Sequence, residues 1–287
     1  MSIYDRINKD KTDIKQSVKA HWEQEPCELR AGKSKADHRR FFEEIDAFRY
    51  AVSPFVMGFA KFADGSGKKV LEVGLGSGSD FMRWARGGAE LYGIDLTEAS
   101  VALIRDRVAM EEKTADVRVG DAEALPFSND FFDIVYSCGV IHHTPDTEKA
   151  AQELYRVCAP GGIIRIMIYH LGGLTWFYQY ILFGLLKGKP FRSRREIAFY
   201  HNESLGTKLY TKSEARKLFP PSAVVTTTTI VDAGDTLNFP LSERYKNNLL
   251  LKIAFRIFFF LKYLRPLIPS FFGTSMLIEV EKPREHP

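Results

Sequence analysis

Apolar residues in the first part of the chain gather in short runs that are separated by segments of helical periodicity. The runs lie at residues 70–73, 91–94, 117–119, 132–135 and 163–168. Between them, apolar positions recur at the three- and four-residue spacing of an amphipathic helix. Strands that alternate with helices predict an α/β fold with a parallel sheet, in which the strands are apolar because helices cover both faces.

The helices between these strands have recognisable start and stop signals. Ser79 is the expected N-cap of the helix after the first strand, and Gly87 or Gly88 ends that helix. Thr97 is the expected N-cap of the next helix, because an apolar stripe that begins at Val101 follows it.

Two or three further helices are predicted ahead of the first strand. Their apolar positions at helical spacing are Ile14, Val18 and Trp22 in one segment and Phe41, Ile45 and Phe48 in the next. Pro54 is expected to start another helical segment, which ends at Phe62.

A glycine-rich turn follows the first strand and indicates a ligand site. Gly74, Gly76 and Gly78 leave almost no side chain above the strand end, so a ligand can approach bare backbone there. Asp95 ends the second strand and faces the same crevice, where its carboxylate can accept both hydroxyls of a ribose. This βαβ unit predicts a nucleoside-containing cofactor.

The spacing of the turn distinguishes between cofactors. A dinucleotide fingerprint has the form G-x-G-x-x-G, whereas this turn reads G-x-G-x-G and continues with Ser79. Glu72, inside the preceding strand, would repel a pyrophosphate but suits the ammonium group of a methionine moiety. The stretch from Glu72 to Gly78 resembles the first motif of class I S-adenosylmethionine-dependent methyltransferases.

Two later stretches extend this resemblance. Gly120-Asp-Ala-Glu-Ala-Leu-Pro-Phe127 is similar to the adenine-binding segment of the family, in which Asp121 would accept from the exocyclic amine and Ala122 would donate through its backbone. FFDIVYSCGVIHHTPD and ELYRVCAPGG resemble motifs of the methyltransferase type 11 family, which includes the ubiquinone and menaquinone C-methyltransferases. The resemblance covers residues 68–170 and, more weakly, 205–219 and 274–282.

The family resemblance implies a Rossmann-like sheet of seven strands in the order 3-2-1-4-5-7-6, with strand 7 antiparallel and helices on both faces. Residues 224–231 and 274–280 would supply strands six and seven, because they are the remaining apolar or β-branched runs. We expect residues 1–287 to form a single decorated domain. Residues 1–62 would be an N-terminal helical lid, 63–170 the cofactor-binding core, and 171–287 helical insertions on the substrate side together with the last two strands.

The same resemblance implies S-adenosylmethionine as cofactor and S-adenosylhomocysteine as product. The expected cofactor-binding residues are Glu72, Gly74, Gly76, Gly78, Asp95, Leu96, Asp121, Ala122, Ser137 and Cys138. The lid residues of interest are Tyr4, His21, Trp22, His38 and Tyr50. Helices that merely pack on the sheet are the alternative to a lid.

Candidate catalytic residues must lie at the carboxyl ends of strands four and five, where ligands bind in open α/β sheets. His142, His143, Tyr169 and His170 meet this condition. A sulfonium methyl is already electrophilic, so a base is required only if the acceptor must lose a proton, and histidine serves near neutral pH. A packing role for one histidine of the pair is the alternative.

Composition narrows the class of protein further. With 45% hydrophobic and 26% charged residues the chain is an ordinary globular protein, and its polar N-terminus contains no secretion signal. Cys27, Cys138 and Cys158 are odd in number and have no metal-ligand spacing, which indicates a reducing cytoplasm and no metal site. The positive charge is uneven, since residues 171–287 hold 17 Lys/Arg against 9 Asp/Glu.

Two apolar segments fall within this basic part of the chain. Residues 174–186 lead directly into a basic stretch, and residues 249–272 are interrupted by basic residues. The basic stretch contains Lys187, Lys189, Arg192, Arg194 and Arg195. Neither segment reaches the roughly 20 uninterrupted apolar residues of a membrane span. They are expected either to roof an apolar substrate pocket or to rest on a membrane surface.

Three functional hypotheses follow. The leading one is a methyltransferase that modifies an O, N or C atom of a small, lipophilic or aromatic acceptor by in-line displacement. The second is a methyltransferase acting on RNA or protein, although residues 187–195 are the one basic stretch with flanking aromatics and no RNA-binding module is recognisable. The third is a non-catalytic cofactor-binding protein. The sequence indicates no oligomeric state.

Overall fold

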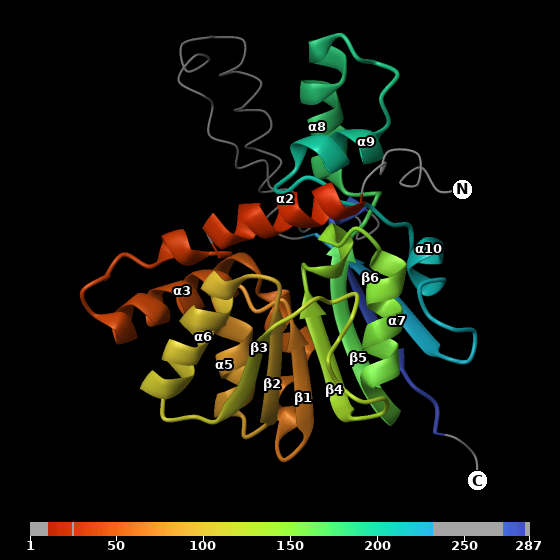
Figure 1. Ribbon diagram of the computed structural model, residues 1–287. Coiled ribbons are helices and arrows are strands. Elements are labelled where there is room, and N and C mark those ends of the chain that lie inside the picture. The colour runs from red at the N-terminus through yellow and green to blue at the C-terminus, as the bar shows by residue number, and fades with distance from the viewer. Residues whose placement is uncertain (1–10, 25, 232–271, 285–287) are drawn as a thin grey trace.

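The computed structural model describes residues 11–24, 26–231 and 272–284. Among these residues, seven strands form one sheet in the order β3-β2-β1-β4-β5-β7-β6 (Figure 1). The strands are β1 (Lys69–Val73), β2 (Glu90–Asp95), β3 (Ala115–Val119), β4 (Phe132–Cys138), β5 (Cys158–Tyr169), β6 (Val224–Ile230) and β7 (Ser275–Glu281). The first five are parallel and β7 is antiparallel to both neighbours, so the predicted topology is confirmed.

Helices surround this sheet. The α-helices are α2 (Lys11–Gln24), α3 (His38–Val52), α4 (Phe55–Ala60), α5 (Ser79–Arg86), α6 (Glu98–Met110), α7 (Thr147–Val157), α8 (Leu174–Phe183), α9 (Arg194–His201) and α10 (Lys212–Arg216). The short 3-10 helices are η1 (Leu29–Ala31), η2 (Phe62–Gly65), η3 (Ile141–His143) and η4 (Leu185–Lys187). Figure 1 shows α2 lying across the end of the sheet where β1, β2 and β4 finish, with α8 and α9 beyond it.

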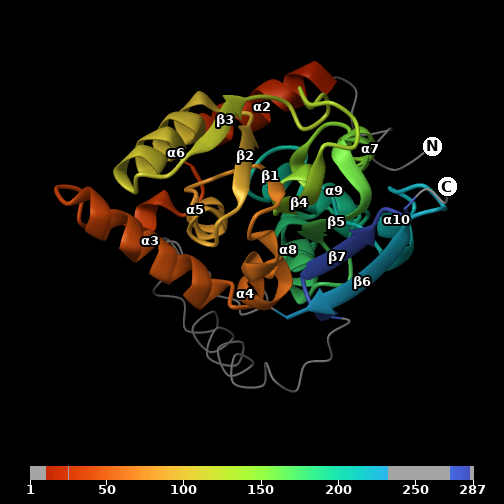
Figure 2. The same ribbon diagram turned by 90° about the horizontal axis from the view of Figure 1, so that it is seen from below.

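The two faces of the sheet bury separate apolar clusters. Val70 of β1 belongs to the cluster that contains Phe81 and Trp84 of α5. Leu71, the next residue of the strand, belongs to the cluster that contains Leu154 of α7. Figure 2 shows α5 and α6 on one side of the sheet and α7 and α10 on the other. Successive side chains of a strand point to opposite faces, so a strand covered on both sides must be apolar throughout.

Some local predictions are confirmed and others are wrong. Thr97 caps α6, since its side chain accepts from the Ser100 amide. Ser79 is not the cap of α5: Gly78 holds that position with a φ of 82°, and α5 begins at Ser79 itself. The buried positions of α3 are Phe42 and Ile45, whereas Phe48 is exposed. The helix is therefore rotated relative to the predicted stripe.

The fifth strand is longer than predicted. The apolar run predicted a strand over residues 163–168, but β5 runs from Cys158 to Tyr169. Cys158 pairs with Phe132, and a register irregularity follows before Ile134 pairs with Ile163. Gly161 adopts a φ of 79°, which accommodates the irregularity without breaking the strand.

The C-terminal insertions are described in part. Residues 171–223 contain α8, α9 and α10, whereas the predicted apolar segment 249–272 lies almost wholly outside the described residues. Tyr4 also lies outside them. None of the helices in the described ranges is long and apolar enough to cross a membrane.

Candidate functional site

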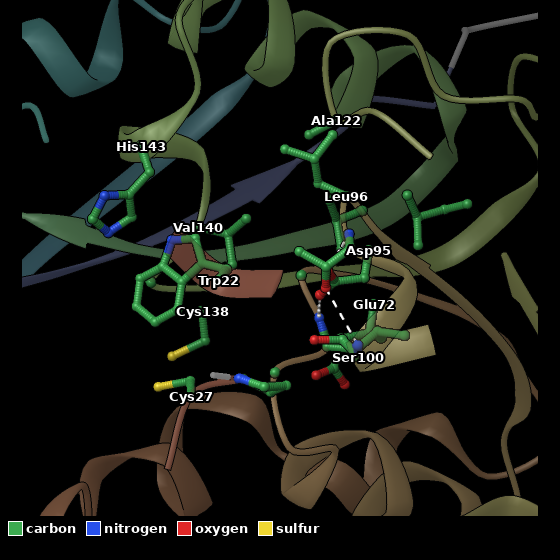
Figure 3. Close-up of a pocket in the computed structure, with 18 of the residues that line it drawn as sticks. Trp22, Cys27, Glu72, Asp95, Leu96, Ser100, Ala122, Cys138, Val140 and His143 are labelled. Atoms are coloured by element: carbon green, nitrogen blue, oxygen red, sulfur yellow. Dashed lines mark hydrogen bonds between the residues drawn. The ribbon is translucent and has the colours of Figure 1, made fainter. Parts of the chain in front are cut away.

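A partly open cavity lies at the carboxyl ends of β1, β2, β3 and β4. Its walls come from the turns that follow these strands, from α2 through Lys15, Val18 and Trp22, and from residues 26–28. Figure 3 shows the carboxylates of Glu72 and Asp95 on one side of the cavity and the rings of Trp22 and His143 on the other. The N-terminal helix therefore covers the crevice, as a lid would.

The three glycines of the turn are explained by different features of the structure. A Cβ on Gly74 would lie 2.1 Å from a methyl carbon of Val140, which follows β4. Gly76 has a φ of 51° and lines the cavity. Gly78 does not line it, and a Cβ there would lie 2.1 Å from Cδ1 of Ile104. Gly74 and Gly76 thus keep the turn bare, whereas Gly78 allows α5 and α6 to pack.

Glu72 is a buried carboxylate on the cavity wall. Its side chain is 3% exposed, and Oε2 has no hydrogen-bond partner among the described residues. Burial, and then the negative charge of Asp80, raise the pKa of Glu72 well above its usual range. An unpartnered buried oxygen in a native site signals a missing partner. A cationic group of a ligand would satisfy it.

Asp95 also faces the cavity, but protein donors already occupy much of its carboxylate. Oδ2 accepts from the Leu75 amide at 2.8 Å, and Oδ1 accepts from the Thr97 amide at 2.9 Å and the Thr97 hydroxyl at 2.7 Å. A carboxylate has about four acceptor positions, so about one stays open. Leu96 beside it lines the cavity as well. The prediction that Asp95 accepts two ribose hydroxyls by itself therefore exceeds its free capacity in this geometry.

Asp121 and Ala122 lie on the wall that β3 leads into. Lys15 of α2 donates to Asp121 Oδ2 at 2.6 Å and to Glu123 Oε2 at 2.7 Å. Burial opposes the charge of Lys15, but these hydrogen bonds raise its pKa above the usual value. The bond joins the lid helix to the segment predicted to bind adenine, a link across 106 positions that no sequence pattern indicated.

Ser137 and Cys138, the last two residues of β4, face different surroundings. Cys138 lines the cavity, and Cys27 lies on its wall as well. Ser137 is fully buried and does not line it; its hydroxyl donates to the carbonyl of Val73 at 3.0 Å. Ser137 therefore ties β4 to β1 and supports the turn indirectly.

Of the four candidate catalytic residues, the structure places His143 on the cavity wall. Its Nδ1 lies 3.1 Å from the Ser204 hydroxyl and 3.2 Å from the Thr207 hydroxyl. Its Nε2 lies 3.4 Å from a carboxylate oxygen of Glu203. Trp22 of the lid meets the imidazole edge-on, with ring centroids 5.9 Å apart.

Glu203 is the residue at this site that sequence reasoning missed. It follows α9 and adopts a φ of 37°, an unfavourable backbone conformation for a non-glycine residue that tends to persist at functional sites. Tyr169 donates to its two oxygens at 2.9 and 3.1 Å. Burial raises the pKa of Glu203, but hydrogen bonds and charge from His143 and then Tyr169 outweigh it, so the pKa is lowered overall.

His142, Tyr169 and His170 lie off the cavity wall. His142 is fully buried, with its ring centroid 4.1 Å from that of His143 and 4.2 Å from that of Tyr169. Neither ring nitrogen of His142 has a partner among the described residues, and burial lowers its pKa well below the usual value. The His170 Nδ1 lies 3.1 Å from the carbonyl of Gly273, away from the cavity. His142 and His170 therefore do not face the cavity in this geometry.

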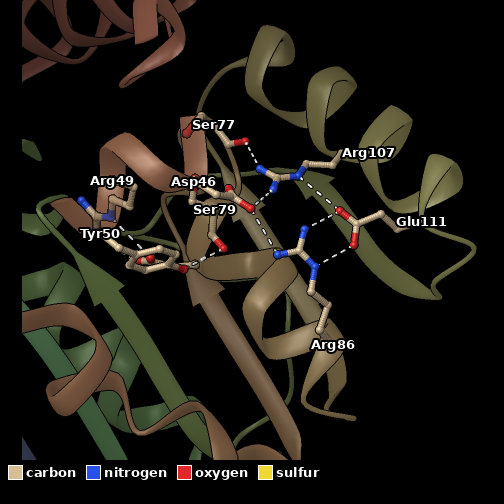
Figure 4. A network of polar contacts seen from close by, with 9 residues as sticks. Asp46, Arg49, Tyr50, Ser77, Ser79, Arg86, Arg107 and Glu111 are labelled. Carbon is tan, nitrogen blue, oxygen red and sulfur yellow. Dashed lines mark hydrogen bonds and ion pairs between the residues drawn. The ribbon is translucent and has the colours of Figure 1, made fainter. Parts of the chain in front are cut away.

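A polar network fastens α3 to the core beside the glycine turn. Arg49 donates to Asp80 at 2.7 and 3.3 Å and to Glu28 at 3.1 Å. Figure 4 shows the adjoining part, in which Asp46 of α3 accepts from Arg107 and Arg86. These residues come from segments far apart in the chain, so no local motif marks them.

The residues predicted to belong to the lid differ in whether they reach the cavity. Trp22 lines the cavity, whereas His21 packs edge-on against Trp22 at 4.7 Å without lining it. The Tyr50 hydroxyl donates to the carbonyl of Ser79 at 3.1 Å. His38 is exposed at the start of α3. No group of His, Cys, Asp and Glu side chains in the described ranges is arranged to hold a metal ion.

Comparison with known proteins agrees with this geometry. A sequence profile described as a methyltransferase domain matches residues 71–166. An uncharacterised protein of Mycobacterium tuberculosis is 35% identical over 131 residues, which is 46% of each chain. The ubiquinone/menaquinone biosynthesis C-methyltransferase UbiE of Neisseria meningitidis is 31% identical over 124 residues, or 40% of this chain and 51% of that one. The chain thus matches about half the length of these relatives.

A solved structure shows the same fold. The S-adenosylmethionine-dependent methyltransferase of Mesorhizobium loti superposes with a TM-score of 0.52 at 14% identity, over 79% of this chain and 96% of the other. The sheet order and the profile match define a class I S-adenosylmethionine-dependent methyltransferase domain at residues 71–166. It is a domain of the methyltransferase type 11 family, as the motifs predicted, and S-adenosylmethionine is the cofactor that this family implies.

Proposed function

We propose that this protein is a methyltransferase that uses S-adenosylmethionine to modify a small, apolar or aromatic acceptor. The observation that carries the proposal is the division of one cavity into two ends of different chemistry. The carboxylates of Glu72 and Asp95 lie on one side of the cavity, and the rings of Trp22 and His143 lie on the other (Figure 3). When bound, S-adenosylmethionine supplies an electrophilic methyl group on a sulfonium.

The first end suits the cofactor. Glu72, with its unpartnered Oε2, would hold the ammonium group, and Asp95 would use its open acceptor position for the ribose. Asp121 and Ala122 would contact adenine. Gly74, Gly76, Leu96 and Cys138 would line the rest of this end, with Gly78 and Ser137 supporting the turn.

The second end suits a lipophilic acceptor. Trp22, Pro26, Val140 and Pro145 are among the residues that line the cavity, and their side chains offer apolar area but few hydrogen bonds. Such a surface binds an apolar molecule and excludes water, which favours methyl transfer by aligning the acceptor and preventing hydrolysis. The similarity to UbiE, a ubiquinone/menaquinone biosynthesis C-methyltransferase, supports this acceptor class.

His143 would be the base for acceptors that must lose a proton. Its Nδ1 lies within hydrogen-bonding reach of the Ser204 and Thr207 hydroxyls, and its Nε2 lies 3.4 Å from the Glu203 carboxylate. A proton taken from the acceptor would form an imidazolium, which the Glu203 carboxylate would stabilise. Glu203 is thus a positioning residue.

The proposed arrangement treats the chain as a single methyltransferase domain. Residues 1–62 would act as the lid, 63–170 as the cofactor-binding core, and 171–287 as substrate-side insertions with β6 and β7. In support, Lys15 and Trp22 of α2 reach the cavity, and Glu203 reaches His143 from the C-terminal part.

The test is transfer of a labelled methyl group from S-adenosylmethionine to fractions of a cell extract, separated by polarity. We expect the labelled product among the lipophilic small molecules. Label in RNA or protein would instead support a macromolecular acceptor. Failure of the protein to bind S-adenosylmethionine would overturn the proposed function.

A matched pair of variants tests the base. His143→Phe is expected to lower turnover about 10²- to 10⁴-fold without changing cofactor affinity, provided the acceptor atom is O or N. Glu203→Gln should give a smaller loss and a shifted pH profile. His170→Phe makes the same change away from the cavity and should remain active. Full activity of His143→Phe on such an acceptor would rule out the base.

A further inference from the structure

The segment from α8 to α9 carries large apolar side chains that are exposed. Leu185 is 47% exposed, Leu186 69% and Phe191 100%, and Phe177 on α8 is 57% exposed. We call residues 185–194 the tip of this segment. Figure 1 shows α8 and α9 projecting beyond α2, at the end of the sheet where β1, β2 and β4 finish, and the cavity lies at that same end. Exposed apolar side chains that cluster in this way mark an interaction surface.

The tip is also basic. Its cations are Lys187, Lys189, Arg192 and Arg194. No carboxylate among the described residues forms an ion pair with any of these four. Residues 174–201 contain five Lys/Arg and one Glu, and that Glu196 is used to cap α9 through Ser193. The excess charge of this segment equals the formal net charge of the whole chain, +4.

The side chains that pack α8 against the rest of the protein do not belong to the tip. Trp176 and Gln179 are buried, and Trp176 donates through its indole N–H to the carbonyl of His170 at 2.8 Å. No residue of α8 lines the cavity. Roofing this cavity therefore does not account for the outward apolar side chains of the segment.

We propose that the tip docks on an anionic lipid surface, with Leu185, Leu186 and Phe191 entering the interface and the four cations contacting lipid headgroups. Lipid bilayers satisfy both features at once, because apolar side chains gain an apolar medium and basic side chains gain negative charge. The cavity lies at the same end of the sheet, so a docked protein holds its site near the membrane surface.

RNA fits the tip less well. A single-strand binding surface needs aromatic faces on which bases stack, interleaved with cations. Here the exposed neighbours of the cations include the aliphatic Leu185 and Leu186, and Phe191 is the one aromatic residue of the tip. Aliphatic side chains offer bases no stacking partner, whereas they insert readily into lipid.

Vesicle flotation of the full chain tests the proposal. One set of vesicles is phosphatidylcholine alone, and the other contains about one third phosphatidylglycerol, enough to give a negative surface potential. We expect the protein to float with the anionic vesicles at low salt, and the bound fraction to fall several-fold as salt screens the charge. The assay contains neither cofactor nor acceptor, so its result is independent of the proposed methyltransferase activity.

Two variants separate charge from insertion. Lys187→Glu with Lys189→Glu should reduce flotation at least tenfold, and Phe191→Ser should reduce it several-fold at every salt concentration. Lys68→Glu with Lys113→Glu makes the same charge change outside the tip, and Phe48→Ser makes the same apolar change on α3. Both controls should float like the unaltered protein. Circular dichroism and cofactor affinity check that every variant folds.

Several outcomes would overturn the proposal. One is no binding to either vesicle type, and another is equal loss in the control variants. Salt-sensitive binding of a labelled RNA oligonucleotide without vesicle binding would assign the tip to nucleic acid. Concentration-dependent dimerisation that Phe191→Ser abolishes, again without vesicle binding, would assign it to a second copy of the chain.

Discussion

Glu72 and His142 are among the buried side chains near the cavity whose polar atoms have no hydrogen-bond partner in the described residues, and they face different surroundings. Glu72 Oε2 belongs to a residue that lines the cavity, whereas His142 is enclosed by the rings of His143 and Tyr169. Burying an unpaired polar group costs free energy, so each needs a compensation. We expect a ligand to supply it for Glu72, while His142 is neutral and contributes packing.

Glu72→Gln tests the ligand role. The change keeps the shape but removes the charge, so the affinity for S-adenosylmethionine should fall about ten- to a hundredfold, measured by calorimetry. The folded-state pKa of Glu72 is raised, which means that its ionised form is destabilising. The free variant should therefore melt at the same temperature or higher. Unchanged affinity would argue against an ammonium contact.

Asp95→Ala should lower the stability of the protein as well as its cofactor affinity, unlike Glu72→Gln. Its carboxylate accepts from Leu75 and Thr97, so the substitution removes acceptors of the turn as well as a ribose partner. We expect both cofactor affinity, again by about ten- to a hundredfold, and thermal stability to fall. Asp116→Ala, on the neighbouring strand β3, is a matched control. A variant with full affinity would contradict the ribose assignment.

His142 makes stability depend on pH. Its folded-state pKa lies well below the ordinary value of about 6.5, so the unfolded chain binds a proton that the folded protein does not. Stability from this residue is present above the unfolded pKa and decreases as pH falls below it, by up to about 1.4 kcal/mol per pH unit. In His142→Phe this part of the pH dependence should disappear in urea denaturation between about pH 6.5 and pH 5. An unchanged slope would count against the assignment.

At the scale of elements, α3 is held to the core by charge as well as by its apolar face. Asp80 is 5% exposed and accepts from both Arg49 and the hydroxyl of Tyr136. Its position at the start of α5 places this ion pair directly beside the glycine turn. The lid segment and the cofactor turn therefore share one buried contact.

Arg49→Met is expected to destabilise the protein by about 3–5 kcal/mol, because it leaves Asp80 buried with one neutral donor. Asp80→Asn in the same chain should recover part of the loss, since the uncompensated charge is then gone. Chemical denaturation of the two single variants and the double variant gives the coupling. Strictly additive losses would show that the ion pair does not couple α3 to α5.

At the scale of the whole molecule, the cavity draws its walls from the N-terminal segment and the core, and Glu203 of the C-terminal part lies behind the wall residue His143. A ligand that fills it should stabilise all three. S-adenosylhomocysteine at a hundred times its dissociation constant should add about 2.7 kcal/mol, or roughly 5–10 °C in melting temperature. Hydrogen exchange should slow in α2 and α3 as well as at the turn. Protection confined to residues 74–79 would contradict the lid.

The sequence was most informative where structure is local. The periodic runs located the five parallel strands, and the glycine spacing with Glu72 identified the family, because both signals lie within short stretches. Sequence patterns predicted the wrong cap residue for α5 and the wrong buried face for α3. There the cap residue and the buried face depend on which neighbour the helix meets.

Among the four candidate catalytic residues, sequence alone offered no choice, because all four follow strand ends. Tertiary structure placed His143 on the wall and enclosed His142, since adjacent residues of a turn face different surroundings. It also brought Glu203, Lys15 and Arg49 to their partners over separations of up to 106 positions. The cofactor class is thus indicated by a contiguous segment of chain, whereas the surroundings of His143 are determined by packing between distant segments, which periodicity and motifs do not encode.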